Sequence, residues 1–238
     1  MIAISNSLKR ISHKKGLFIV IDGNDGSGKS TQIKMLVDRL EEEKMDVLCM
    51  KFPNESENFF GKLIYQYLRD KNSGWEKYKP RDASVFYACD RWESSEKIKK
   101  SISEGHVVIV DRYVSANQIH QGGKIKDIEE RKKFILWLDE LEYKIFKIPR
   151  PNVVFYLSVP LAISEKLLEE RCSCGRQKDA HENDPDFLKN SKKSAEWLSG
   201  TQPNWIRIDC VVGNKMRSIE DIHDEIYEKI KPLLRGKK

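Results

Sequence analysis

The stretch GNDGSGKSTQ, residues 23–32, indicates the fold of this chain, because it predicts a glycine-rich loop between a strand and a helix. Three of its first six residues are glycine, which lets successive backbone N–H groups turn inward around an anion. The apolar, β-branched run LFIVID comes directly before it and is typical of a buried strand. An amphipathic pattern that begins near Lys29 predicts a helix, whose N-terminus adds the positive end of a dipole. This order of strand, glycine loop and helix predicts a loop that holds the phosphates of a nucleoside triphosphate.

The residue types within the loop indicate how the phosphates are held. Residues 23–30 fit the pattern G-x-x-x-x-G-K-[ST], in which the lysine reaches the β- and γ-phosphates and the hydroxyl binds Mg²⁺. We therefore expect Lys29 to act in catalysis and Ser30 to bind the metal. The residues expected to bind ATP are Gly23, Asn24, Asp25, Gly26, Ser27, Gly28, Lys29, Ser30 and Thr31. A glycine turn without a ligand is the alternative interpretation.

A second acid completes the expected magnesium site. The sequence VVIVD, residues 107–111, is an apolar strand that ends in a carboxylate, as the second Mg²⁺-organising acid of P-loop proteins does. We expect Asp111 to take part in catalysis and to bind Mg²⁺ directly or through water. ATP is then a co-substrate and Mg²⁺ the cofactor.

Strand-like runs alternate with amphipathic stretches along the rest of the chain. The expected strands are residues 17–22, 46–52, 106–111, 152–159 and 205–209, and the expected helices are residues 31–43, 83–103, 128–146 and 219–233. In the third helix, Phe134, Leu138, Leu141 and Ile145 recur at helical spacing and are expected on its apolar face. This alternation predicts a single α/β domain with a five-stranded parallel sheet and helices on both faces. The ligand of such a sheet lies at the carboxyl ends of its strands.

Composition narrows the class of protein. The 238 residues carry 43 Lys and Arg against 37 Asp and Glu, and the net charge of +6 suits a phosphate-rich ligand. The five cysteines are widely spaced, and no apolar run has the length of a signal peptide or a membrane span. We therefore expect a soluble, cytoplasmic protein without a membrane partner. Nucleic-acid binding is disfavoured because the chain lacks a focused run of basic and aromatic residues.

Several motifs occur along the chain in the order found in the thymidylate kinases, and the chain therefore resembles these P-loop enzymes, which phosphorylate dTMP to dTDP with ATP. They are IDGNDGSGKSTQ (21–32), KFP (51–53), FYACDRWE (86–93), VDRYVSANQIHQ (110–121), PRPNVVFYLSV (149–159) and RCSCGRQKDAHE (171–182). The resemblance runs from about residue 17 to residue 233. It implies a nucleoside monophosphate kinase fold with a short lid at about 171–182. It also implies one kinase domain over residues 16–238, after an extension at 1–15, and a homodimer.

The resemblance implies how the acceptor base is read. Residues four apart share one face of a helix, so Tyr87 and Arg91 are placed to face one base. In the family an aromatic at this position stacks on thymine and the arginine bonds a thymine carbonyl; Phe86 is the alternative aromatic. Asn117 stands where some members place an amide on the thymine ring. The residues expected to bind dTMP are Asp25, Phe52, Pro53, Tyr87, Arg91, Arg112, Asn117 and His120.

The sugar and the phosphate of the acceptor also have implied partners. A carboxylate beside a phosphate cradle is electrostatically unfavourable, so Asp25 is expected to have a hydroxyl partner, the 3′-hydroxyl of the family's substrate. Arg112 resembles the arginine that grips the acceptor phosphate and is expected to be catalytic. His120 stands where an aromatic often crowds the sugar 2′ position, a departure that leaves the exclusion of ribonucleotides open.

The lid motif is expected to supply positive charge as the γ-phosphate moves. Arg171 and Arg176 are the expected catalytic residues, with Lys178 as a third candidate. Gly26 stands where other members carry a P-loop arginine, which favours a lid arginine here.

The segment after residues 51–53 departs from the family. It lacks the arginine that many members place there, and the candidates to replace it are Arg69, Arg81 and Arg112.

Two alternative functions also stay open: a related kinase that accepts dUMP or another nucleoside monophosphate, and a non-catalytic nucleotide-binding sensor. The complete phosphate-binding set speaks against the sensor.

Overall fold

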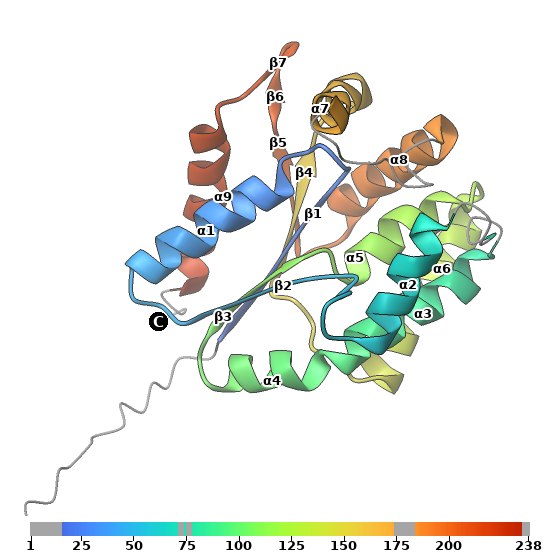
Figure 1. The fold of residues 1–238 in the computed structure, drawn as a ribbon, viewed down its shortest axis with the longest axis horizontal. Helices are drawn as coiled ribbons and strands as arrows, with labels where there is room; N and C mark the ends of the chain where they lie inside the picture. Colours follow the sequence, from blue (N-terminus) through green and yellow to red (C-terminus); the bar gives the residue numbers. More distant parts are fainter. Residues whose placement is uncertain (1–15, 71–73, 75–77, 174–183, 235–238) are drawn as a thin grey trace, which may run out of the picture.

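The computed structural model describes residues 16–70, 74, 78–173 and 184–234, and only the backbone of residues 170–173. A five-stranded parallel sheet with the order β2–β3–β1–β4–β5 lies at its centre, which confirms the expected sheet (Figure 1). Its strands are β1 (Leu17–Gly23), β2 (Val47–Lys51), β3 (Val107–Asp111), β4 (Val153–Ser158) and β5 (Trp205–Asp209). A short hairpin, β6 (Val211–Val212) and β7 (Lys215–Met216), follows β5 and was not expected.

Helices occupy most of the remaining described chain. They are α1 (Lys29–Glu42), α2 (Phe59–Arg69), α3 (Pro80–Glu93), α4 (Ser95–Ser103), α5 (Val114–Ala116), η2 (Asn117–Gln121), α6 (Ile128–Asp139), η3 (Glu140–Ile145), α7 (Leu161–Ser173), α8 (Pro185–Thr201) and α9 (Ile219–Leu234), where η marks a π-helix. None of these described helices combines the length and the apolar character that a membrane span requires.

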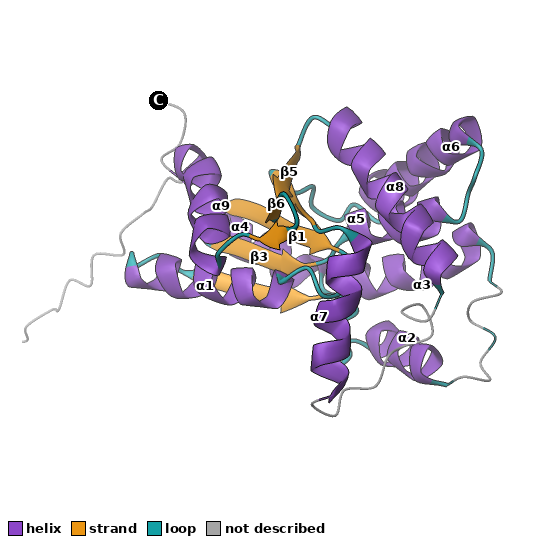
Figure 2. Cartoon of the chain, turned by 90° about the horizontal axis from the view of Figure 1, so that it is seen from above, coloured by secondary structure: helices purple, strands orange, loops and turns teal. Residues whose placement is uncertain are grey.

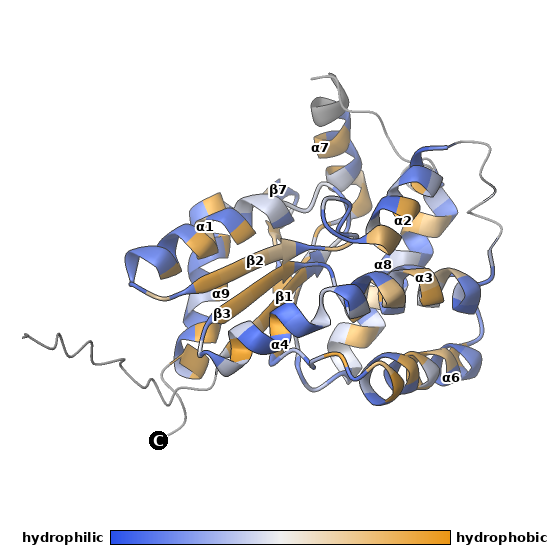
Figure 3. Cartoon of the chain, turned by 60° about the horizontal axis from the view of Figure 1, so that its bottom comes forward, coloured by the Kyte–Doolittle hydropathy of each residue, from blue (hydrophilic) through white to orange (hydrophobic). Residues whose placement is uncertain are grey.

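The strands are buried on both faces, and alternate residues enter two different cores. Phe18 and Val20 of β1 pack into the core covered by α4, α6 and α8. Ile19 and Ile21 point the other way, into the core covered by α1 and α9. Figure 1 shows α1 and α9 on one side of the sheet and α6 and α8 on the other, and Figure 2 shows these two pairs well apart when seen from above. Figure 3 shows apolar strands between helices with hydrophilic outer faces. A sheet buried on both faces explains why its strands read as continuous apolar runs.

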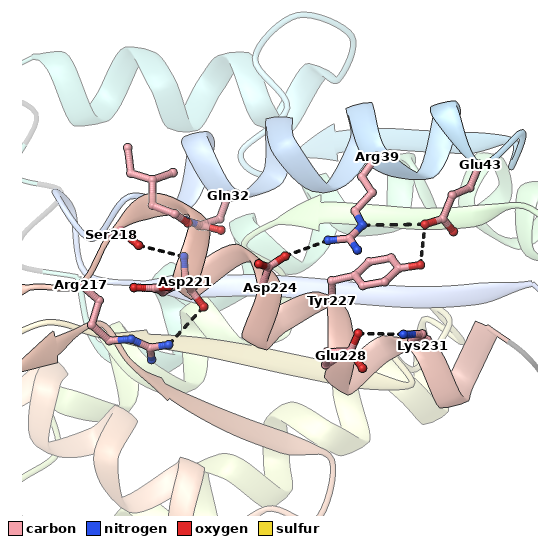
Figure 4. Close-up of polar contacts among 11 residues, drawn as sticks. Gln32, Arg39, Glu43, Arg217, Ser218, Asp221, Asp224, Tyr227, Glu228 and Lys231 are labelled. Carbon is pink, nitrogen blue, oxygen red and sulfur yellow. Dashed lines mark hydrogen bonds and ion pairs between the residues drawn. The ribbon is translucent and has the colours of Figure 1, made fainter.

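A polar seam joins α1 to α9 (Figure 4). The guanidinium of Arg39 lies 3.4 Å from the ring centroid of Tyr227 and donates to Asp224 at 2.9 Å. Near the start of α1, Gln32 Nε2 donates to the carbonyl of Ile219 at 2.9 Å. These contacts fix α9 against the helix that follows the phosphate loop.

The expected helix over residues 83–103 is wrong, because the chain forms two helices there. Asn58, from the distant start of α2, donates through Nδ2 to the carbonyl of Asp90 at 2.7 Å and to Oγ of Ser94 at 2.8 Å. The Asp90 carbonyl is thereby occupied near the end of α3, and a new helix starts at Ser95. The break depends on a contact between segments far apart in sequence, which helical periodicity does not contain.

The apolar face expected over residues 128–146 is correct only for its first half. Phe134 and Leu138 are buried, whereas Leu141 is half-buried and Ile145 is 64% exposed. The chain is π-helical from Glu140, so the period of 3.6 residues no longer applies. The shift buries Glu142 completely.

Candidate functional site

Most of the expected site residues that the structure describes meet at the carboxyl ends of the central strands. Asp111 ends β3 and lies opposite Ile21 of β1 on one side and Lys51 of β2 on the other. The phosphate loop leaves β1 at the same edge, and Phe52 follows β2. Several cavities open at this edge, among them one at the loop, one beside it, and a larger one of about 530 Å³ that borders Ser30, Lys51 and Asp111.

The phosphate loop forms a cradle of backbone groups. Gly26 and Gly28 have φ angles of 79° and 86°, values that side chains disfavour, and Gly28 begins α1. A glycine supplies no side-chain cap, so the first N–H groups of α1 stay available for an anion. The loop borders a cavity of about 270 Å³, which we call the phosphate cavity, and its lining residues are Asp25, Gly26, Ser27, Gly28, Lys29, Ser30, Asp111 and Arg112.

Lys29 lies folded over the loop at this cavity. Its Nζ donates to the carbonyls of Gly23 and Asn24 at 2.9 and 3.0 Å, and lies 3.7 Å from a carboxylate oxygen of Asp25. The residue is 7% exposed. Burial and the nearby Arg112 lower the pKa of this ammonium, while the surrounding carboxylates oppose them. The amine is thus held beside the cavity by two neutral carbonyls, with the Asp25 carboxylate slightly farther away.

The oxygen ligands at the loop fit a magnesium ion. Oδ1 of Asp111 is buried without a hydrogen-bond partner in the described part of the chain, and the exposed Ser30 lines the same cavity. Within the described ranges, no group of three or more His, Cys, Asp or Glu side chains is placed to hold a metal. One carboxylate and one hydroxyl suit Mg²⁺, which keeps several waters and takes further oxygens from phosphates.

The second cavity, of about 300 Å³, opens beside the phosphate loop. All the residues expected to bind dTMP line it, together with Asn24, Lys51, Glu55, Tyr65, Leu68, Asp111, Tyr113, Ala116, Gln121, Phe187 and Leu188. We call it the acceptor cavity. It shares Asp25, Asp111 and Arg112 with the phosphate cavity, so a ligand in one faces a ligand in the other.

Arg91 is held rigidly in the wall of the acceptor cavity. Its Nε and Nη2 donate to the two carboxylate oxygens of Glu142, both at 2.6 Å, and its Nη1 donates to the carbonyl of Tyr113 at 3.2 Å. Arg91 is 1% exposed and Glu142 is 0% exposed. Burial alone lowers the pKa of Arg91, but the paired carboxylate outweighs it and raises the pKa. The arginine therefore stays charged, with N–H groups on Nη1 and Nη2 left over for a ligand.

Arg112 lies where the two cavities meet. Its Nη2 donates to Oδ1 of Asp25 at 2.7 Å, and its Nη1 lies 2.7 Å from Nε2 of His120. Its backbone has a φ of 66°, which turns the chain sharply at the end of β3. Burial raises the pKa of Asp25, but Arg112 and Lys29 outweigh it and hold that pKa well below its usual range. Asp25 is thus a carboxylate that neutralises part of a strongly cationic site.

The two aromatic candidates separate in the structure. Tyr87 lines the acceptor cavity. Phe86 packs edge-on against Phe60 and Tyr78, with ring centroids 6.4 and 6.3 Å away. This arrangement favours Tyr87 as the aromatic that meets a ligand.

Other expected residues lie apart from the cavities or outside the described residues. Gly23 and Thr31, both expected to bind ATP, line neither cavity. Arg81 lies over the ring of Trp137, whereas Arg69 contacts Tyr65 at the cavity wall. The side chain of Arg171 and the whole of Arg176 and Lys178 are outside the described residues.

Sequence reasoning missed further residues of the site. Glu142 gave no signal because its role depends on a π-helical segment and a partner in α3. Gln121 was the last residue of a quoted motif but was assigned no role; it is 2% exposed, lines the acceptor cavity and has an Oε1 without a partner among the described residues. Phe187 enters the cavity from α8, a helix that was not expected.

Comparisons with known proteins give one result. Residues 21–226 match the family model described as Thymidylate kinase. The chain is 30% identical over 219 residues to the thymidylate kinase of Plasmodium falciparum (isolate 3D7), covering 91% of this chain and 90% of the relative. It is 27% identical over 213 residues to the thymidylate kinase of Homo sapiens, covering 90% and 89%. Its fold is similar to the solved thymidylate kinase of Candida albicans, with a TM-score of 0.69 and 24% identity over 92% of each chain.

Proposed function

Because this chain belongs to the thymidylate kinase family and phosphorylates dTMP with ATP, we propose that the phosphate cavity and the acceptor cavity hold the two substrates head to head. ATP phosphates occupy the phosphate cavity and dTMP occupies the acceptor cavity. The observation that carries this assignment is the shared wall of Asp25, Asp111 and Arg112, which brings the two ligands together at their phosphates.

On this proposal, catalysis consists of positioning and charge neutralisation. A phosphate oxygen of dTMP is already nucleophilic, so in-line transfer needs no covalent intermediate and no strong general base. The loop N–H groups hold the ATP phosphates, and Lys29 leaves its carbonyl partners to meet the γ-phosphate. Ser30 and Asp111 would hold Mg²⁺, which supplies positive charge to the β- and γ-phosphate oxygens when bound.

The acceptor residues divide between phosphate and base. Arg112 forms part of the shared wall, where its planar guanidinium is suited to grip two phosphate oxygens. Arg91 and Tyr87 lie on one face of α3, where the arginine bonds a thymine carbonyl and the tyrosine stacks on the ring. Asp25 accepts from the sugar 3′-hydroxyl with the lone pairs that Arg112 leaves free, and Asn117 and His120 complete the pocket.

A further cation for the transition state is assigned to Arg171 or Arg176. The phosphate loop itself has no room for one at Gly26, because a Cβ there would lie 2.6 Å from the Ser164 carbonyl of α7. This close approach supports a source outside the loop.

A panel of monophosphates tests the acceptor assignment. We expect the turnover of dTMP, measured as ADP release with ATP and Mg²⁺, to exceed that of dCMP, dGMP and AMP by at least ~100-fold in kcat/KM, because polar groups built for one base are left unpaired by another. dUMP, which has the same carbonyls, should differ by only ~10-fold, as one methyl group does in a pocket. A ribonucleotide or purine preferred over dTMP would refute the assignment.

We also propose a homodimer formed through α2, α3 and η3. Large apolar side chains are exposed on these contacting helices, with Phe59 67%, Trp92 54% and Ile145 64% exposed. A patch of this kind on a globular protein marks an interaction surface.

Charge placed in the patch should separate the subunits. Trp92→Glu is expected to halve the mass measured by light scattering, because an unpaired buried carboxylate opposes association. Val212→Glu, at a site that is 72% exposed on β6, is the control and should leave the mass unchanged. A wild-type protein of monomer mass would contradict the proposal.

A further inference from the structure

His120 lies on η2, between the acceptor cavity and α8. Its Nε2 is 2.7 Å from Nη1 of Arg112, and its Nδ1 is 3.3 Å from Oγ of Ser191. Its ring stacks on that of Phe187, with centroids 5.7 Å apart and planes 13° apart. The ring is therefore fixed on its face by one residue of α8 and at Nδ1 by another.

The contact with Arg112 determines where the histidine proton lies. A guanidinium has only N–H donors, so Nε2 of His120 must be the acceptor. A neutral imidazole has one acceptor nitrogen and one N–H, so the proton is on Nδ1 and is donated to Ser191. Ser191 is 1% exposed, and it lines neither cavity.

This histidine also determines how Arg112 is oriented. Asp25 holds Nη2 of the guanidinium at 2.7 Å and His120 holds Nη1 at 2.7 Å, so both terminal nitrogens are fixed from the protein side. The plane of the guanidinium decides whether it meets two phosphate oxygens or one. A hydrocarbon ring at position 120 would fill the same space but would have no lone pair for Nη1.

We propose that His120 is a positioning residue for the acceptor phosphate: its neutral ring, protonated at Nδ1 toward Ser191, orients the Arg112 guanidinium. The inference rests on the proposed function, because it takes Arg112 as the group that binds the phosphate of dTMP. It differs from a role in crowding the sugar, which needs the bulk of the ring and not its nitrogen.

Binding of dTMP and of thymidine separates these roles. His120→Phe keeps the ring and its stacking partner but removes the acceptor. We expect its Kd for dTMP, measured by calorimetry, to rise ~10-fold or more, the effect of one charge-assisted hydrogen bond, while the Kd for thymidine stays within ~2-fold. Equal weakening of both ligands, or an unchanged Kd for dTMP, would overturn the inference.

The effect should also depend on Arg112. In an Arg112→Met background, His120→Phe is expected to change the Kd for dTMP by less than ~2-fold, because coupled residues are not additive. A further loss of ~10-fold there would show that His120 acts independently of the arginine and would overturn the inference.

Ser191→Ala tests the tautomer without touching either cavity. We expect a rise of ~3-fold in the Kd for dTMP and none for thymidine, since a neutral hydrogen bond is weaker than a charged one. Ser199→Ala, whose Oγ bonds within α8, is the matched control and should leave both constants unchanged. The tautomer can also be read directly from ¹⁵N spectra of the wild-type protein, in which the His120 signals are assigned as those lost in His120→Phe. We expect the signals of a neutral ring protonated at Nδ1. A neutral ring protonated at Nε2 would overturn the inference.

The failure of this inference is distinguishable from the failure of the proposed function. Wild-type protein that binds dTMP no more tightly than thymidine would overturn the phosphate site, and the inference with it. A wild-type preference for dTMP that persists in full in His120→Phe would overturn the inference alone.

Discussion

Replacing Lys29 by alanine is expected to lower kcat for dTMP phosphorylation by at least ~1,000-fold, the effect of losing a charge that stabilises a transition state in a water-poor site. The lysine already lies at the phosphate cavity, where its partners are the carbonyls of Gly23 and Asn24. Exchanging neutral acceptors for a phosphate is favourable, so the amine moves to the ligand at little cost. ADP release, followed in a coupled assay at saturating ATP and dTMP, measures the loss.

The same substitution should leave folding nearly intact. Burial disfavours the charged form of Lys29, so the removal of the amine also removes a desolvation cost. Lys34→Ala is the matched control, because that lysine is exposed on the same helix and forms a surface ion pair with Asp38. Its kcat is expected within ~2-fold of wild type, as for a surface ion pair. If Lys29→Ala retained a tenth of wild-type turnover, the cavity would not be the site of ATP phosphates.

The phosphate loop and the acceptor cavity differ in how far they could be predicted from the sequence. The loop is local: its glycines, Lys29 and Ser30 are neighbours in the chain, and the strand and helix around them follow from short-range pattern. The sheet was predictable for a related reason, because a strand buried on both faces is a continuous apolar run.

The acceptor cavity is not local, and prediction from sequence was correspondingly incomplete. Tyr87 and Arg91 were assigned through the family resemblance, with which their spacing on one helix agrees, and both line the cavity. Glu142, which grips the arginine, comes from a π-helical segment, and Asn58 ends α3 from the start of another helix. Such partners are fixed by tertiary contacts, and the periodicity of a single sequence predicts local elements but not contacts between distant segments.

The second prediction distinguishes the role of Arg91 in thymine recognition from the contribution of the Arg91–Glu142 pair to the stability of the protein. Glu142→Leu leaves the Arg91 guanidinium buried without its carboxylate, and we expect the free energy of unfolding to fall by ~3–5 kcal/mol. Arg91→Met leaves the Glu142 carboxylate buried without its cationic partner and should cost a similar amount. The double variant removes both charges, so its stability should return to within ~1–2 kcal/mol of wild type. Urea unfolding of the four proteins measures this cycle.

The double variant should regain stability but not its affinity for dTMP. The double variant lacks the N–H groups that we propose bind a thymine carbonyl, so we expect its KM for dTMP to stay ~10- to 100-fold above that of wild type, the loss of a hydrogen bond from a charged donor. Its KM for ATP should change by less than ~2-fold, because Arg91 does not line the phosphate cavity. A double variant that is stable and has a wild-type KM for dTMP would show that the buried pair serves the fold alone. A matched rise in both KM values would mean that the pair supports the whole site and does not read the base.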